Sequence, residues 1–180
     1  VRAIPSGPTE DERDRLPQVF FLCMTLAQRR IFIITPYFIP TPDILRALQS
    51  AALRGIDVRI LTPGRNNHVY AGLAARARYE PLLEAGVRIF ERAPPFIHAK
   101  AMVVDDEVSL IGTSNLDVRS LVLNYESDML VYSAEFASAL TGVMNKDFRA
   151  SREILLSKWR RRSPGSRFLE NFCNLLSPIL

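Results

Sequence analysis

The stretch Ile31-Phe32-Ile33-Ile34-Thr35, ended by Pro36, is a short apolar run rich in β-branched residues, which predicts a buried strand. Further apolar runs alternate with helical patterns along the chain: strands over residues 56–62 and 87–90, and helices over residues 42–54 and 69–85, stopped by Gly55 and Gly86. Strands that alternate with helices over short connections predict parallel pairing, with helices on both faces of the sheet.

The pattern changes on either side of this unit. The first fifteen residues are polar with two prolines and predict a loop, followed by a helix that begins near Pro17. Apolar runs at 99–104 and 108–111 flank three acidic residues and predict a hairpin. A short strand over 129–132, a helix from Ala134 and an amphipathic segment over 168–180 complete an α/β fold. Its sheet is expected to be mixed but mostly parallel.

Composition supports one globular domain over residues 1–180, since 48% of the 180 residues are hydrophobic and 23% are charged. Cys23 and Cys173 lie in apolar runs and are expected as buried free thiols. No apolar stretch is long enough to span a membrane and no signal peptide is visible. The chain opens on Val1, so further sequence is expected before it. The net charge of +4 favours anionic partners such as phosphate esters, nucleic acid or acidic lipid.

Two groups suited to phosphate chemistry lie close together in Phe96-Ile97-His98-Ala99-Lys100-Ala101-Met102. Alternation along a strand would place His98 and Lys100 on one face. A buried lysine is costly unless it meets an anion, and a phosphate would meet both groups. An edge strand with one face in water is the alternative reading of these two residues alone.

More polar groups follow at short spacing. Gly112-Thr113-Ser114-Asn115 combines a glycine that permits a tight turn with a hydroxyl and an amide that can donate to phosphoryl oxygens. Glu126 supplies a carboxylate just before an apolar strand. A carboxylate on one nitrogen of a histidine fixes its tautomer and leaves the other nitrogen free to attack.

The spacing His98-x-Lys100-x4-Asp105-x6-Gly112-Thr113-x-Asn115 resembles the HKD signature of the phospholipase D superfamily. Further stretches resemble bacterial cardiolipin synthases: Ile4 to Pro8, Thr35 to Pro40, Ala51 to Arg59, Asn115 to Ser120 and Leu175 to Leu180. The resemblance covers essentially the whole chain and is to the C-terminal half of those enzymes.

The resemblance implies a role for each matching residue. His98 would act as nucleophile, forming a phosphohistidine, or as general acid and base, and Glu126 would orient it. Lys100 and Asn115 would bind the phosphoryl oxygens, as would Thr113, which stands where the family more often has serine. Asp105 ends the motif, either as a catalytic residue or as a structural turn residue. No metal and no cofactor are implied.

The implied activity is phosphatidyl transfer between two phosphatidylglycerol molecules, giving cardiolipin and glycerol at the bacterial cell membrane. The family uses two HKD motifs, and this chain has one, so a second half of the same chain or a homodimer partner is expected. Two alternatives remain: a phospholipase D-type phosphodiesterase or nuclease acting as a homodimer, and a non-catalytic membrane-binding module. The small net charge and the aromatics in apolar runs make nucleic acid the less favoured partner.

Three other features carry weaker predictions. His68 and Tyr37 each follow the end of a strand, where ligands bind in α/β folds, and could line the site. The basic cluster Lys158 to Arg162, with Trp159 inside it, could lie at an anionic membrane surface. The alternative is a basic helix end that complements the helix dipole.

Overall fold

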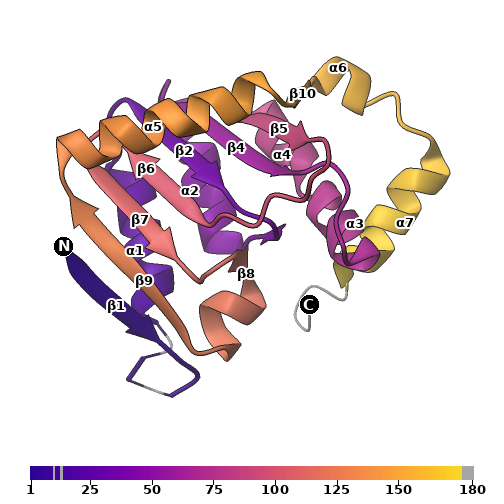
Figure 1. Cartoon of the computed structure of the whole chain (residues 1–180). Helices are drawn as coiled ribbons and strands as arrows, with labels where there is room; N and C mark the ends of the chain where they lie inside the picture. Colours follow the sequence, from indigo (N-terminus) through magenta and orange to yellow (C-terminus); the bar gives the residue numbers. More distant parts are fainter. Residues whose placement is uncertain (10, 13, 176–180) are drawn as a thin grey trace.

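The computed structural model describes residues 1–9, 11–12 and 14–175 as one α/β layered domain (Figure 1). Its main sheet has the strand order β1-β9-β7-β6-β2-β4-β5-β10, and β3 pairs separately with β8. The strands are β1 (Arg2–Ser6), β2 (Arg30–Ile34), β3 (Phe38–Ile39), β4 (Asp57–Pro63), β5 (Arg88–Arg92), β6 (Ala101–Val104), β7 (Val108–Gly112), β8 (Leu116–Asp117), β9 (Glu126–Tyr132) and β10 (Arg152–Ile154). The helices are α1 (Arg15–Leu26), α2 (Pro42–Leu53), α3 (Val69–Ala77), α4 (Tyr79–Glu84), the π-helix η1 (Arg119–Leu123), α5 (Ala134–Arg149), α6 (Leu156–Trp159) and α7 (Pro164–Leu175).

The mixed α/β fold is confirmed, but the parallel share of the sheet is smaller than predicted. Among the described strands, β2 pairs in parallel with β4, and β4 with β5. The other pairings of the main sheet are antiparallel. The difference arises because the predicted hairpin of β6 and β7 attaches to β2 in the middle of the sheet, and β9 and β1 then extend it in antiparallel steps.

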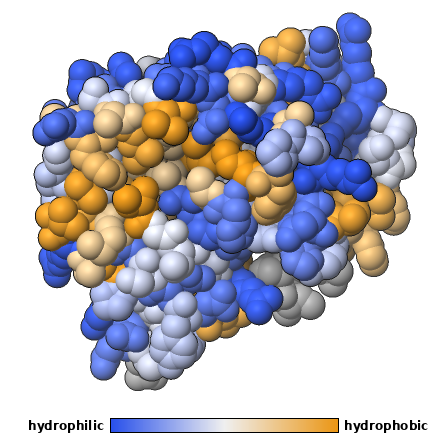
Figure 2. Space-filling model, viewed as in Figure 1, coloured by the Kyte–Doolittle hydropathy of each residue, from blue (hydrophilic) through white to orange (hydrophobic). Residues whose placement is uncertain are grey.

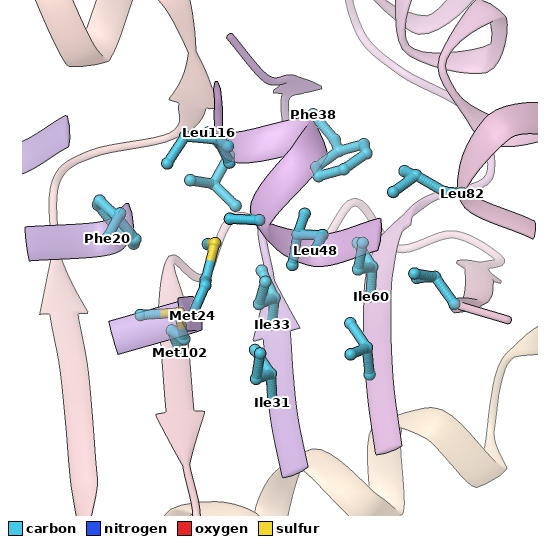
Figure 3. Close-up of a cluster of buried hydrophobic side chains, with 14 of the residues drawn as sticks. Phe20, Met24, Ile31, Ile33, Phe38, Leu48, Ile60, Leu82, Met102 and Leu116 are labelled. Atoms are coloured by element: carbon cyan, nitrogen blue, oxygen red, sulfur yellow. The ribbon is translucent and has the colours of Figure 1, made fainter. Parts of the chain in front are cut away.

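Both faces of the central strands are buried. On β2, Ile31 and Ile33 point into the larger core under α1 and α2, where Met24, Leu48 and Ile60 meet them (Figure 3). Phe32 and Ile34 point to the opposite face, which α5 covers with Ala137, Met144 and Phe148. This two-sided burial explains the continuous apolar run at 31–34, since a strand with one wet face would alternate.

Two of the predicted helix boundaries are confirmed and one helix is divided. Gly55 and Gly86 follow helices with φ of 88° and 97°, a left-handed conformation that glycine adopts without a steric cost. The single helix expected over 69–85 is instead α3 and α4, separated at Arg78. Pro81 explains the break, because it has no N–H to donate and its ring would clash with the carbonyl of Ala77 in a continuous helix.

The two edge strands were missed in the sequence. Residues 2–6, predicted as loop, form β1 and pair with β9 from Glu126 to Leu130. β10 pairs with β5 at the opposite edge. Pro5 is compatible with β1 because an edge strand can leave one side of its backbone unpaired. Each edge is defined by a partner far away in the sequence, so local pattern carries little sign of it.

The basic cluster at 158–162 does not present its tryptophan to a membrane. Trp159 is 4% exposed and its ring packs on Tyr79, with the Arg162 guanidinium 3.6 Å from the ring centroid. Arg162 also pairs with the buried Glu170 of α7. The cluster therefore joins α6 to α4 and α7, and the prediction of Trp159 at a lipid surface is wrong. Of the predicted amphipathic segment 168–180, residues 176–180 lie outside the described part.

Both cysteines are free, with Cys173 buried and Cys23 half-buried. Burial raises the pKa of the Cys23 thiol to about 11, which keeps it protonated and unreactive at neutral pH.

Candidate active site

Nearly all of the predicted site residues lie along one margin of the sheet. This margin, called the site edge below, is formed by the carboxyl ends of β2 and β4 and is distinct from the edge strands β1 and β10. Tyr37 and His68 follow the carboxyl ends of the parallel strands β2 and β4. β6 runs antiparallel to β2, with Ala101 opposite Ile34, so Lys100 at its start lies at the same edge. The end of β7 and the start of β9 meet there too, since Gly112 is opposite Asp128. Residues 37, 68, 98–100, 112–115 and 126 converge there, although the first and the last are 89 positions apart in the sequence.

His98 and Lys100 lie in the extended segment just before β6, not on the strand itself as the sequence predicted. The Lys100 Nζ is 3.2 Å from His98 Nε2 and 3.1 Å from the His98 carbonyl oxygen. Burial lowers the pKa of Lys100, and the carboxylates of Glu126, Asp117 and Asp128 oppose that shift. The exposed imidazole and the half-buried ammonium thus form one pair at the sheet edge, on which the charges of three carboxylates act.

The turn after β7 is built around Asp128, which sequence analysis did not single out. Asp128 is 2% exposed, and its Oδ1 accepts hydrogen bonds from Thr113 N at 2.9 Å and Ser114 N at 3.1 Å. A Cβ on Gly112 would overlap that oxygen, so this close approach requires glycine. Burial raises the pKa of Asp128, and the two backbone donors oppose the rise.

This turn positions the two phosphate-binding candidates. The Thr113 Oγ1 accepts from Ser127 N at 3.0 Å, which leaves its own proton free to donate outward. Asn115 donates through Nδ2 to Ser120 Oγ at 3.1 Å, and its buried Oδ1 has no hydrogen-bond partner among the described residues.

A pocket of about 240 Å³ opens beside Asn115. Its wall includes both weaker candidates, His68 and Tyr37, together with Tyr70, Arg119 and Asn124. Aromatic rings connect it to the histidine of the motif: centroid distances are 6.0 Å from His98 to Phe96, 6.5 Å from Phe96 to Tyr37 and 6.0 Å from Tyr37 to His68. His68 and Tyr37 therefore lie within the same concave region as Asn115.

Glu126 is placed at the site edge, at the start of β9. Its Oε1 accepts from Asn124 Nδ2 at 3.2 Å. No hydrogen bond joins it to His98 within the part of the chain that the structure describes, so its orienting role stays a prediction. Its charge does act on the Lys100 ammonium, whose pKa it raises.

Asp105 lies at the opposite end of β6 from the other candidates. β6 separates it from Lys100, a distance of about 16 Å at the usual rise along a strand. Its carboxylate accepts from the backbone N–H groups of Gln28 at 2.8 Å, Arg29 at 2.7 Å and Arg30 at 3.0 Å. The structure favours the structural role of Asp105, which joins the hairpin turn to the start of β2, and it does not support a catalytic one.

Asp117 is the second acidic residue missed by the sequence reading. It is buried, accepts a hydrogen bond from Ser120 N at 2.7 Å near the start of η1, and lines the pocket. Burial raises the pKa of Asp117 to about 6. The sequence did offer one sign of both residues, namely an acidic side chain at a position expected to face inward. On β9, for example, Asp128 alternates with Leu130 and Glu126 on one face of the strand.

Within the described ranges, no group of three or more His, Cys, Asp or Glu side chains is arranged to hold a metal ion. The same residues include no helix long and apolar enough to cross a bilayer.

Comparison with solved structures identifies the class of fold. The chain is similar to the phospholipase D family member Nuc from Salmonella typhimurium, with a TM-score of 0.71 and 20% identity over 86% of this chain and 99% of that chain. It is also similar to phosphatidylserine synthase from Haemophilus influenzae, with a TM-score of 0.79 and 16% identity over 99% of this chain and 47% of that chain. The domain therefore has the phospholipase D-like fold.

Sequence comparison narrows the class to one family. Residues 22–148 match the family described as cardiolipin synthase, PLD-like domain, and the chain belongs to that family. It is 39% identical over its whole length to cardiolipin synthase 1 of Bacillus anthracis, covering 35% of that protein, and 42% identical to cardiolipin synthase of Halalkalibacterium halodurans, covering 36%. The chain thus spans about a third of the length of these curated relatives.

Proposed function

We propose that the chain is one catalytic half of a phosphatidyltransferase that makes cardiolipin and glycerol from two molecules of phosphatidylglycerol. The observation that carries this proposal is the convergence of His98, Lys100 and Asn115 at one sheet edge, in a chain of the cardiolipin synthase family. The imidazole supplies a nucleophile or proton carrier, and the ammonium and the amide supply hydrogen-bond donors to the phosphoryl oxygens, the ammonium with a positive charge as well.

The proposed reaction consists of two displacements. One histidine of a facing pair attacks the phosphorus of the first lipid, forming a P–N bond as the bond to the glycerol oxygen breaks, and the other histidine gives that oxygen a proton. The hydroxyl of the second lipid then attacks phosphorus, the P–N bond breaks, and the hydroxyl proton returns to the second histidine. His98 takes one of these two roles.

The second histidine must come from another half-site. The described site contains His98 and, in the neighbouring pocket, His68, whose side chain interacts with Tyr70 and Tyr37 and not with Lys100. Apolar side chains are exposed over β7 and β9 beside α5 (Figure 2), with Met129 39% exposed. This face adjoins the site edge, and we assign it to contact with a second half-site of the same polypeptide or with a second copy of the chain.

The function is tested by incubating the purified protein with phosphatidylglycerol in mixed micelles and resolving the products. Equal amounts of cardiolipin and glycerol are expected when both half-sites are present. Phosphatidic acid alone would point to a hydrolase, cleavage of single-stranded DNA to a nuclease, and no product to a non-catalytic module. The 180-residue chain alone is expected to be inactive as a monomer, and a monomer that makes cardiolipin at the full rate would contradict the two-half arrangement.

The outward face of α7 is the surface that best suits contact with lipid. Phe168, Phe172 and Leu175 point away from the domain and are 73%, 54% and 75% exposed, while Glu170 and Cys173 on the opposite face are buried. A helix that faces water normally exposes its polar side chains and buries its apolar ones. α7 lies against α3, whose Tyr70 lines the pocket (Figure 1).

Removing this face should weaken binding to lipid. The change Phe168→Ser together with Phe172→Ser is expected to lower partitioning onto phosphatidylglycerol vesicles by about tenfold or more, since each buried aromatic contributes roughly 1.5–3 kcal/mol. Sedimentation with vesicles measures the effect. Leu53→Ser is the control, because Leu53 is 74% exposed at the end of α2 and should not change partitioning. Unchanged vesicle binding combined with a change in solution mass would show instead that α7 contacts a protein partner.

A further inference from the structure

The pocket beside Asn115 has an arginine that the proposed chemistry at His98 does not use. Arg119, the first residue of η1, lines this pocket and is exposed. Within the described residues it makes no ion pair, unlike the paired Arg92 and Arg162. The acidic residue of the pocket wall, Asp117, accepts from Ser120 N with one oxygen, and Arg119 acts on Asp117 through charge alone. The guanidinium is thus available to an anion that enters the pocket.

The pocket is separate from the position of the reacting phosphate but adjoins it. His98 and Lys100 are not among the residues of its wall, whereas Asn115 is. Besides Arg119, the wall offers the imidazole of His68 and the amide of Asn124 as polar groups. Its volume of about 240 Å³ lies below the roughly 300–1,000 Å³ of pockets for drug-sized ligands, so it suits a polar head group and not a whole lipid.

We propose that this pocket binds the head-group phosphate of the acceptor lipid and that Arg119 is its anion-binding residue. The inference rests on the proposed function, in which the attacking hydroxyl belongs to a glycerol that carries its own phosphate. That second phosphate must lie beyond the glycerol from the reacting phosphorus, and Arg119 lines the same pocket as Asn115, which the motif places at the reacting phosphate. A guanidinium can hold two phosphate oxygens through paired N–H donors, which would fix the direction of the acceptor hydroxyl.

The test compares an anionic acceptor with a neutral one in the active assembly. Arg119→Gln is expected to lower the ratio of transfer to phosphatidylglycerol over transfer to isotopically labelled free glycerol, which gives labelled phosphatidylglycerol, by at least about tenfold, through a raised KM for phosphatidylglycerol, as expected for the loss of one charged hydrogen-bonding partner. Arg119→Lys keeps the charge but lacks the paired N–H donors of the guanidinium, so its transfer ratio should lie between those of the wild type and Arg119→Gln. Arg65→Gln is the matched control: it removes the same charge from an exposed loop residue outside the pocket wall and should leave the ratio unchanged.

Several outcomes would overturn the assignment. A ratio in Arg119→Gln within twofold of the wild type, or an equal fall with both acceptors, would show that Arg119 does not select the acceptor. Calorimetric titration supplies a second measurement, since glycerol phosphate should bind the wild-type chain at least tenfold more tightly than the Arg119→Gln chain. If the wild-type chain binds inorganic phosphate as tightly as glycerol phosphate, the pocket is a general anion site and not a head-group site. Wild-type protein that transfers to neither acceptor would refute the proposed function itself.

Discussion

Replacing His98 by alanine is expected to abolish phosphatidyl transfer in the assembled enzyme, with activity falling to the background of the assay. The imidazole either forms the P–N bond or carries the proton, and among the described residues His98 is the histidine that contacts Lys100. The measurement is the rate of cardiolipin formation from phosphatidylglycerol, with circular dichroism to verify the fold. His98 is exposed and outside the regular strands, so the substitution should leave the domain intact.

His68→Ala is the matched control for this experiment. His68 lines the neighbouring pocket and interacts with Tyr70 and Tyr37, so its loss should lower the rate much less than that of His98. Equal and near-complete losses in both variants would contradict the assignment of His98 as the reacting histidine of this half-site. If the isolated chain proves to be an active dimer, mixing it with His98→Ala chains should lower activity as the square of the wild-type fraction.

Lys100→Met is expected to lower turnover by roughly a hundredfold to a thousandfold or more, the range seen when one preorganised donor to a developing oxyanion is removed. The ammonium lies against His98, in the position where phosphoryl oxygens would meet both groups. Methionine keeps much of the length and apolar contact of the lysine stem, so thermal stability should change little. The initial rate of cardiolipin formation, measured beside a melting curve, separates a chemical effect from unfolding.

Two observations would count against this role of Lys100. Turnover of Lys100→Met close to that of the wild type would show that another group neutralises the phosphate. Loss of wild-type activity on adding a chelator, or recovery of Lys100→Met on adding a divalent cation, would show that a metal ion shares the task.

Much of the candidate site could be predicted from the sequence because its residues are chemically distinctive and closely spaced. His98, Lys100, Thr113 and Asn115 lie within one short segment, and that segment carries the family signature. Asp105 belongs to the same signature, yet it lies at the other end of β6 with its carboxylate bound to the backbone at 28–30. Spacing along a chain therefore identified the motif without distinguishing a residue of the site from one that holds the hairpin.

The sequence by itself determined the elements whose signals are local. The continuous apolar run of β2, the glycine stops after α2 and α4, and the hairpin of β6 and β7 depend on residues only a few positions apart. Only the tertiary structure decided which strands form the edges of the sheet, because the register of β1 with β9 joins residues 120 to 128 positions apart. It likewise decided that Trp159 is buried, that Gly112 must make room for Asp128, and that Arg119 shares a pocket with Asn115. These features depend on free energies of packing and pairing between distant segments, which leave no periodic pattern in either segment alone.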